Sequence, residues 1–126
     1  MDIVENYGML NLMHKKLDVY KKTQLMVKEI YRLTEDLPKH ELFGLTSQVR
    51  RAAVSVCSNI AEGAARFSNS EKKRFYEIAR SSLVEIDAQI EICVNLCYLS
   101  SDKLFKFEGY MEDVFKMLSK MIRNLS

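Results

Sequence analysis

Apolar side chains recur at helical spacing along most of this chain. Steps of three and four residues place such side chains on one face of a helix. The clearest run has an apolar residue at every seventh position: Leu104, Met111, Leu118 and Leu125. This regular spacing is typical of long helices that pack at a shallow angle. The whole pattern predicts four helices, at about residues 15–34, 45–65, 69–98 and 103–124.

Local start and stop signals separate the four predicted helices. Pro38 disfavours helical geometry in the residue before it, so the first helix should end just ahead of it. Ser68 and Glu71 form a capping-box pattern at the start of the third helix. Gly63 predicts either a C-terminal cap or a close approach between helices. Short connections between four long helices predict a single all-α domain over residues 1–126, an antiparallel up-down-up-down four-helix bundle.

The apolar faces of these helices are wider than one bundle needs. The first and fourth predicted helices carry apolar residues outside their main stripes: Tyr20, Val27, Tyr31, Tyr110, Phe115, Met117 and Ile122. We expect part of this surface to meet another copy of the chain, so that the protein forms a homo-oligomer. The alternative is scattered exposure of apolar side chains, which is normal on monomers.

Composition places the chain in the ordinary globular class. Its 126 residues are 48 % apolar and 29 % charged, with only one proline and four glycines. The N-terminal stretch has early acids and no basic start followed by an apolar run, so it does not resemble a signal peptide. No apolar run reaches the roughly 20 residues that a membrane span needs. We therefore expect a cytoplasmic protein with no membrane partner.

Charge is distributed unevenly along the chain, although the net charge is only +2. Between residues 45 and 80, seven basic residues outnumber three acidic ones. Between residues 81 and 102 there are four acidic residues and no basic one. A chain polarised in this way can present a basic face despite its modest total charge.

The residue types that build catalytic or metal sites do not cluster in this sequence. Cys93 and Cys97 share a predicted helix face, but a structural zinc site needs four ligands, and Cys57 lies in another helix. We interpret all three cysteines as reduced thiols in a packed core. Neither His14 nor His40 follows a glutamate by three residues, as the di-iron bundles require. Nucleophile-elbow, Walker and dinucleotide-binding motifs are missing too, so we expect no enzyme activity, no metal and no cofactor.

Arg50 and Arg51 are adjacent in the second predicted helix, so their side chains point about 100° apart. Three interpretations of this pair stay open. The arginines could lie on a solvated helix face, one of them could form a buried ion pair with Glu62 or Glu85, or one could contact a phosphate.

The junction of the second and third predicted helices is the better candidate for binding nucleic acid. Arg66, Lys72, Lys73 and Arg74 cluster there, and Arg51 is a further candidate. The free N–H groups and the positive dipole end of the third helix would also attract phosphate. Nonspecific affinity rises with each phosphate neutralised, so copies of the cluster in an oligomer would act together. No motif for reading bases accompanies the cluster.

Two stretches of this chain closely resemble a known protein family. They are "LPKHELFGLTSQVRRAAVSVCSNIAEGAAR" at residues 37–66 and "RFYEIARSSLVEIDAQI" at residues 74–90. They resemble the small proteins encoded in intervening sequences of bacterial 23S ribosomal RNA genes, also labelled the S23 ribosomal protein family. The accessory variability protein of diversity-generating retroelements is a relative of this family. The resemblance extends from about Leu17 to Leu125.

The resemblance implies an architecture and a set of partners. Structurally known relatives look like antiparallel four-helix bundles that form homopentamers with a central channel. The retroelement relative binds nucleic acid and a reverse transcriptase through a basic surface. The branch encoded in intervening sequences has no established enzyme activity. For this chain the resemblance implies a pentameric scaffold that binds RNA or DNA, with a reverse transcriptase as a further partner if its gene is linked to a retroelement. The alternative is a protein–protein interaction module without a nucleic-acid role.

The residues shared with the family also suggest how the second and third helices are held in register. Small residues in the segment at 59–63 would let the two helices approach closely. Buried polar groups must be paired, and a paired network fixes helix register. We therefore expect a structural polar network among these residues: Arg50, Asn59, Glu62, Glu85 and Gln89.

Overall fold

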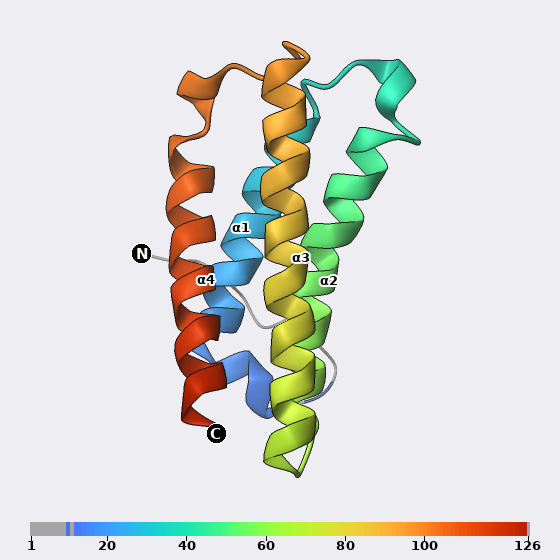
Figure 1. Cartoon of the computed structure of the whole chain (residues 1–126). Helices are drawn as coiled ribbons and strands as arrows, with labels where there is room; N and C mark the ends of the chain where they lie inside the picture. Colours follow the sequence, from blue (N-terminus) through green and yellow to red (C-terminus); the bar gives the residue numbers. More distant parts are fainter. Residues whose placement is uncertain (1–9, 11, 126) are drawn as a thin grey trace.

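The computed structural model describes residues 10 and 12–125, and its four α-helices agree with the all-α prediction (Figure 1). Residues 1–9, 11 and 126 lie outside the described part, and with them most of the N-terminal stretch that we judged unlike a signal peptide. The helices are α1 (Asp18–Thr34), α2 (Leu45–Ala65), α3 (Asn69–Asn95) and α4 (Phe105–Asn124). Short 3₁₀ turns at Met13–Lys16 and Ser101–Lys103 make α1 and α4 begin a few residues later than predicted.

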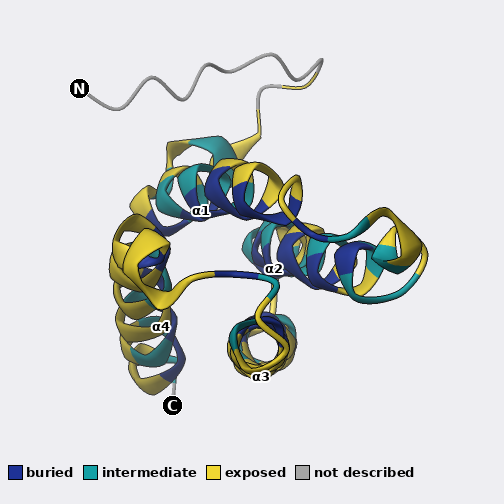
Figure 2. Ribbon diagram, turned by 90° about the horizontal axis from the view of Figure 1, so that it is seen from above, coloured by how far each residue is buried: buried dark blue, intermediate teal, exposed yellow. Residues whose placement is uncertain are grey.

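The four helices surround one interior. Both α1 and α3 pack against α2 and α4, so the helices follow one another around the bundle in chain order (Figure 2). In Figure 1 the α1–α2 and α3–α4 connections lie at one end and the α2–α3 connection lies at the other. No helix in residues 12–125 is long and apolar enough to cross a membrane.

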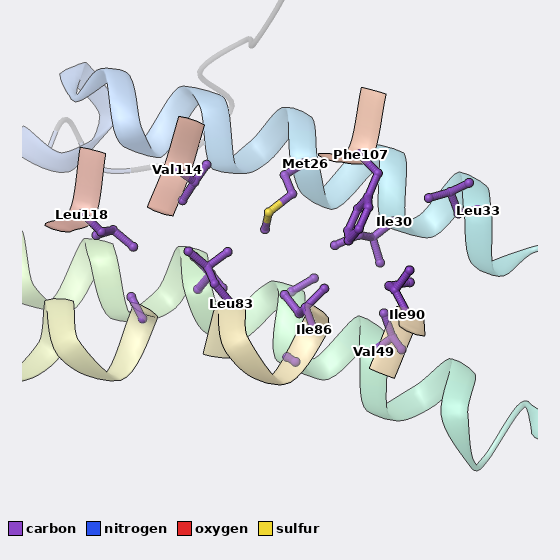
Figure 3. Close-up of a cluster of buried hydrophobic side chains, with 14 of the residues drawn as sticks. Met26, Ile30, Leu33, Val49, Leu83, Ile86, Ile90, Phe107, Val114 and Leu118 are labelled. Atoms are coloured by element: carbon purple, nitrogen blue, oxygen red, sulfur yellow. The ribbon is translucent and has the colours of Figure 1, made fainter. Parts of the chain in front are cut away.

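The core is built from the apolar stripes read in the sequence. Side chains from all four helices point into the same interior, and Met26, Ile30 and Leu118 are completely buried there (Figure 3). Burial of apolar surface drives folding at roughly 25 cal/mol per Å². The stripes that sequence periodicity predicted therefore provide the main stabilising contact between the helices.

The C-terminus of α3 differs from its prediction. The helix ends at Asn95 instead of about residue 98, because Cys97 adopts a left-handed conformation with φ of 63°. The N–H of Tyr98 donates to the carbonyl of Cys93 at 2.8 Å, and the N–H of Cys97 donates to that of Val94 at 2.9 Å. This pair of bonds is a Schellman motif, which usually has glycine at the left-handed position. With cysteine there, the sequence carries no recognisable stop signal.

Candidate nucleic-acid interface

The predicted basic cluster lies at the α2–α3 tip, which we define as residues 62–75. α2 ends at Ala65, and Arg66 and Ser68 have extended backbones that reverse the chain. The Ser68 hydroxyl accepts the N–H of Glu71 at 3.2 Å, which is the N-terminal half of the predicted capping box. The turn is therefore short and well defined, and it holds the first residues of α3 beside the last residues of α2.

Gly63 allows this close approach. A Cβ atom at this position would lie 2.6 Å from Cε1 of Tyr76 and 3.2 Å from Cβ of Phe75. Of the two roles that the sequence suggested for Gly63, close approach between helices is the one observed. The contact places Phe75 and the basic residues around it directly against the end of α2.

Two of the four basic residues at the tip have partners within the chain. The guanidinium of Arg66 forms an ion pair with Glu62 at 3.0 Å and lies 4.7 Å from the ring centroid of Phe75. The ammonium of Lys72 donates to the carbonyls of Gly63 at 3.4 Å and Ala64 at 3.1 Å. Those carbonyls belong to the last turn of α2, where a cation also offsets the helix dipole. Arg66 and Lys72 therefore stabilise the tip itself.

The other two basic residues remain available to a ligand. The ion pairs of the described residues involve neither Lys73 nor Arg74. Arg74 is exposed and lies 4.9 Å from the centroid of the Phe75 ring, which steadies its guanidinium. Phe67 at the turn is 100 % exposed. The tip thus combines two unpaired cations with an aromatic ring in solvent.

Sequence reasoning did not identify Phe67 as an exposed residue of the tip. Its signal was a lone aromatic residue within the polar run "RFSNS" at residues 66–70, outside the periodic positions of either helix. An aromatic residue in such a place has no core to enter, whereas one on a periodic stripe does. The same reasoning applies to Phe43, in the connector between α1 and α2, which is 92 % exposed.

Arg51, the fifth candidate for binding nucleic acid, does not lie at the tip. It lies on α2, fifteen residues before Arg66, which follows the end of that helix, and this separation corresponds to roughly 22 Å along the helix axis. Arg51 is exposed and lines a small groove together with Glu85, and no ion pair joins the two residues. It therefore belongs to a different surface from the other four.

Arg50 bonds to α1 and to neither of the glutamates considered as its partners. Its Nε donates to the Thr34 hydroxyl at 2.9 Å, and its Nη2 donates to the carbonyl of Tyr31 at 3.4 Å. Its guanidinium also lies 4.6 Å from the centroid of the Tyr31 ring. Arg50 therefore links α2 to the end of α1 through neutral groups.

The polar contact between α2 and α3 involves only one of the five residues we expected to form a network. The hydroxyls of Ser55 and Ser82 lie 3.1 Å apart, and the amide of Asn59 donates to the Ser55 carbonyl at 2.8 Å and to its hydroxyl at 3.1 Å. Of the five residues, only Asn59 takes part. Glu62 and Glu85 are exposed. Glu62 pairs with Arg66 at the tip, and Arg50 bonds to α1.

Gln89 is buried in this α2–α3 region, and its Oε1 atom has no hydrogen-bond partner among the described residues. Such an unpaired acceptor costs stability unless water reaches it. The two serines that carry the contact are small residues on the packed face, and Ser82 is buried like its apolar neighbours. The sequence signal for this contact was the presence of small polar residues at positions on the packed faces of α2 and α3.

The cysteines occupy three different environments. Cys93 is buried, as expected of a core thiol, whereas Cys97 is exposed, so the packed-core interpretation is wrong for Cys97. Cys57 is partly covered, and burial raises the pKa of its thiol to about 12. A thiol with so high a pKa is poorly reactive near neutral pH. Within residues 12–125, no three metal-binding side chains gather into a cluster.

Comparison with known proteins places the chain in a family. No curated protein matches it. The family model described as "23S rRNA-intervening sequence protein" matches residues 15–120, which include all of α1, α2 and α3 and most of α4. The match therefore covers the tip and the helices that position it. The chain belongs to the family of 23S rRNA-intervening sequence proteins.

Proposed function

We propose that this protein is a non-enzymatic scaffold of the cytoplasm that binds RNA or DNA through its α2–α3 tip. Each subunit is an antiparallel up-down-up-down bundle, and the subunits form a homo-oligomer, a pentamer in our proposal. One observation carries the nucleic-acid part. The tip carries Lys73 and Arg74, neither of which has an acidic partner among the described residues, and it exposes the ring of Phe67 at its turn. Positive charge beside a free aromatic face is the combination that binds single-stranded nucleic acid without sequence preference.

The charge balance of the tip explains why assembly matters. Residues 62–75 contain four basic and two acidic side chains, and the Arg66–Glu62 pair cancels one of each. Two free cations can neutralise only about two phosphates, so one subunit would bind weakly at physiological salt. Several tips on one oligomer would bind one long strand together, because linked sites raise each other's effective concentration.

Exposed apolar surface supports the oligomeric part. Phe43, Phe105 and Val84 are large apolar residues that the bundle leaves largely in solvent. Apolar surface of this kind often marks a protein–protein contact. Light scattering on the purified chain tests this part directly. A mass of one chain would refute the homo-oligomer.

Binding to structured RNA, single-stranded RNA and duplex DNA, measured at several salt concentrations, tests the nucleic-acid part. The test variant carries Lys73→Gln and Arg74→Gln. The matched control carries Lys39→Gln and Lys106→Gln. These exposed lysines lie in the α1–α2 connector and in the first turn of α4, and in Figure 1 both segments are at the end of the bundle opposite the tip. We expect the test variant to reduce the slope of log affinity against log salt for duplex DNA by about 1.8 for each subunit in contact. The control should keep the wild-type slope.

A third variant, Phe67→Ala, separates stacking from charge. Stacking of a base on an aromatic side chain contributes roughly 1–3 kcal/mol per base, and the base must be unpaired. Phe67→Ala should therefore weaken binding to single-stranded RNA and leave duplex binding unchanged. If the wild type shows no salt-dependent binding, the nucleic-acid role is refuted. The exposed apolar surface would then favour the second candidate, an interaction module that binds only proteins.

A further inference from the structure

Two grooves lie on opposite sides of the bundle. The α1–α2 groove has a volume of about 630 Å³ and is lined by α2, the end of α1 and the connector between them. The α3–α4 groove has a volume of about 380 Å³ and is lined by the two helices for which it is named. The α1–α2 pair and the α3–α4 pair lie on opposite sides of the bundle (Figure 2), and each groove lies on one of these pairs.

The α1–α2 groove is apolar and positively charged. Its apolar lining includes Phe43, Val54 and Tyr31, all of them exposed. Its charged residues are Arg50 and Arg51, and none of the acidic residues that the structure describes lines it. The Tyr31 ring and the Thr34 hydroxyl hold the Arg50 guanidinium in place. This guanidinium has no carboxylate partner within residues 12–125. It can bind a carboxylate of another molecule at little cost, because little side-chain freedom remains to be lost on binding.

The α3–α4 groove is apolar and carries the opposite charge. Val84 and Phe115 are its exposed apolar residues. Its lining contains three acidic residues and one basic residue: Asp87, Glu108, Glu112 and Lys116. Lys116 forms an ion pair with Glu112 at 2.7 Å, so Asp87 and Glu108 remain without a basic partner among the described residues. Arg80 approaches the Phe115 ring at 5.9 Å, but it does not line the groove.

We propose that the α1–α2 groove of one copy docks onto the α3–α4 groove of the next copy. This inference rests on the homo-oligomer of the proposed function and names the surfaces that meet. Both faces are apolar and their charges are complementary, two unpaired arginines facing two unpaired carboxylates. Contact between two different faces is head-to-tail, and a head-to-tail contact closes into a ring when its rotation permits. Two copies of the same groove would instead bring like charges together.

Phe43 provides the apolar anchor of this contact. It is 92 % exposed and lines the α1–α2 groove. Aromatic residues at the centre of an interface, with charged pairs around them, commonly carry most of the binding energy. Phe43 therefore inserts between α3 and α4 of the neighbouring copy, beside Val84 and Phe115 of that copy.

Two face variants test the proposal in the full chain. The first carries Phe43→Ser and Arg51→Glu in the α1–α2 groove, and the second carries Asp87→Lys and Glu108→Lys in the α3–α4 groove. All four residues are exposed, so both variants should keep the helical circular dichroism of the wild type. The matched control carries Phe67→Ser and Arg123→Glu, which are exposed and line neither groove. Masses are measured by size-exclusion chromatography with light scattering.

The head-to-tail contact predicts a specific result on mixing. Each face variant alone should have the mass of one chain, and the control should keep the wild-type mass. An equal mixture of the two face variants should give a dimer of one copy of each, because each copy retains one intact face and the two faces are complementary.

Other outcomes overturn the inference in different ways. If the wild type is oligomeric and either face variant keeps its mass, other surfaces form the oligomer and only this inference fails. If one variant is monomeric and the other forms a dimer by itself, the surviving face contacts its own copy and the head-to-tail contact is refuted. If the wild type itself is a monomer, the homo-oligomer of the proposed function fails as well.

Discussion

Gly63 and Gly109 both lie inside helices, but only Gly63 touches a neighbouring helix. A Cβ atom on Gly63 would lie 2.6 Å from the buried Tyr76 ring, whereas no atom outside its own helix lies within 4 Å of one on Gly109. Glycine costs about 1 kcal/mol relative to alanine within a helix. Both glycines therefore carry the same helix-propensity cost, but only at Gly63 would an added methyl group clash with a neighbouring helix.

We expect Gly63→Ala to lower the free energy of unfolding and Gly109→Ala to raise it. Overpacking costs roughly 1–3 kcal/mol, and with a contact of 2.6 Å to the buried Tyr76 ring we expect this cost to exceed the gain in helix propensity at Gly63. At Gly109 only the gain of about 1 kcal/mol remains. Urea denaturation of both variants beside the wild type measures the difference. A gain in stability at Gly63 equal to that at Gly109 would contradict the close approach.

At the scale of elements, a hydrogen-bonded group ties the α1–α2 connector to the end of α3. The Tyr98 hydroxyl donates to Oε2 of Glu41 at 3.0 Å. The other oxygen of Glu41 accepts the N–H of Leu45 at 3.2 Å, at the first residue of α2. One carboxylate therefore caps α2 and holds α3 beside the connector. This hydrogen bond to Glu41 is the main reason why the pKa of Tyr98 lies above its ordinary value of 10.0.

This raised pKa makes the contribution of Tyr98 to stability depend on pH. The hydroxyl is protonated in both the folded and the unfolded state at neutral pH, so its stabilising bond is fully present there. As pH rises through the pKa of the folded state, the phenolate can no longer donate and repels Glu41. We expect Tyr98→Phe to be less stable than the wild type near neutral pH, and the difference to shrink above about pH 10. Urea denaturation at both pH values measures it.

Tyr31→Phe is the control for this experiment. No hydrogen bond within residues 12–125 uses the Tyr31 hydroxyl, and the ring that lies against Arg50 is kept. Its stability relative to the wild type should not follow the pH profile of Tyr98→Phe. A Tyr98→Phe difference that stays constant through the alkaline range would show that the bond to Glu41 contributes nothing.

At the scale of the whole molecule, all four helices depend on one shared core. Leu118 of α4 is completely buried, and it faces Leu83 of α3 in the same interior (Figure 3). Removing a buried leucine side chain costs about 2–5 kcal/mol, because the surroundings close the cavity only in part. We expect Leu118→Ala to lower the free energy of unfolding by this amount, measured by circular dichroism in urea.

Leu96→Ala is the matched control for the core. Leu96 is 50 % exposed at the end of α3, so its truncation should change stability by no more than about 0.5 kcal/mol. Both variants are compared with the wild type at one protein concentration, since the stability of an oligomer depends on concentration. Equal effects at the two positions would contradict a core shared by all four helices.

Most of the fold could be predicted from the sequence, because helix signals are local. α2 begins at Leu45 and ends at Ala65, as the apolar periodicity predicted. Ser68 caps α3 through a bond to a residue three positions away. The end of α3 was mispredicted for a local reason as well. Cysteine is an uncommon residue at the left-handed position of a Schellman motif, so the stop at Asn95 had no glycine to mark it.

The candidate site was predictable in position but not in composition. Four basic residues close together in sequence at a helix junction are necessarily close in space, so the location of the tip followed from local order. Which cations remain free depends on neighbours. Arg66 and Lys72 bond to the end of α2, whereas Lys73 and Arg74 do not. Which of the four cations bond to α2 depends on the direction in which each side chain leaves its helix and on the close approach of the two helices at Gly63.

The sequence by itself determined the helices, their order and the residues of the core, because hydrogen bonds and periodicity within a helix span only a few positions. The tertiary structure alone decided the partners of long polar side chains and the surface that remains open. Arg50 meets Thr34 and Tyr98 meets Glu41 across 16 and 57 residues of chain. Contacts over such separations depend on how whole helices pack, and no local pattern in the sequence records that packing.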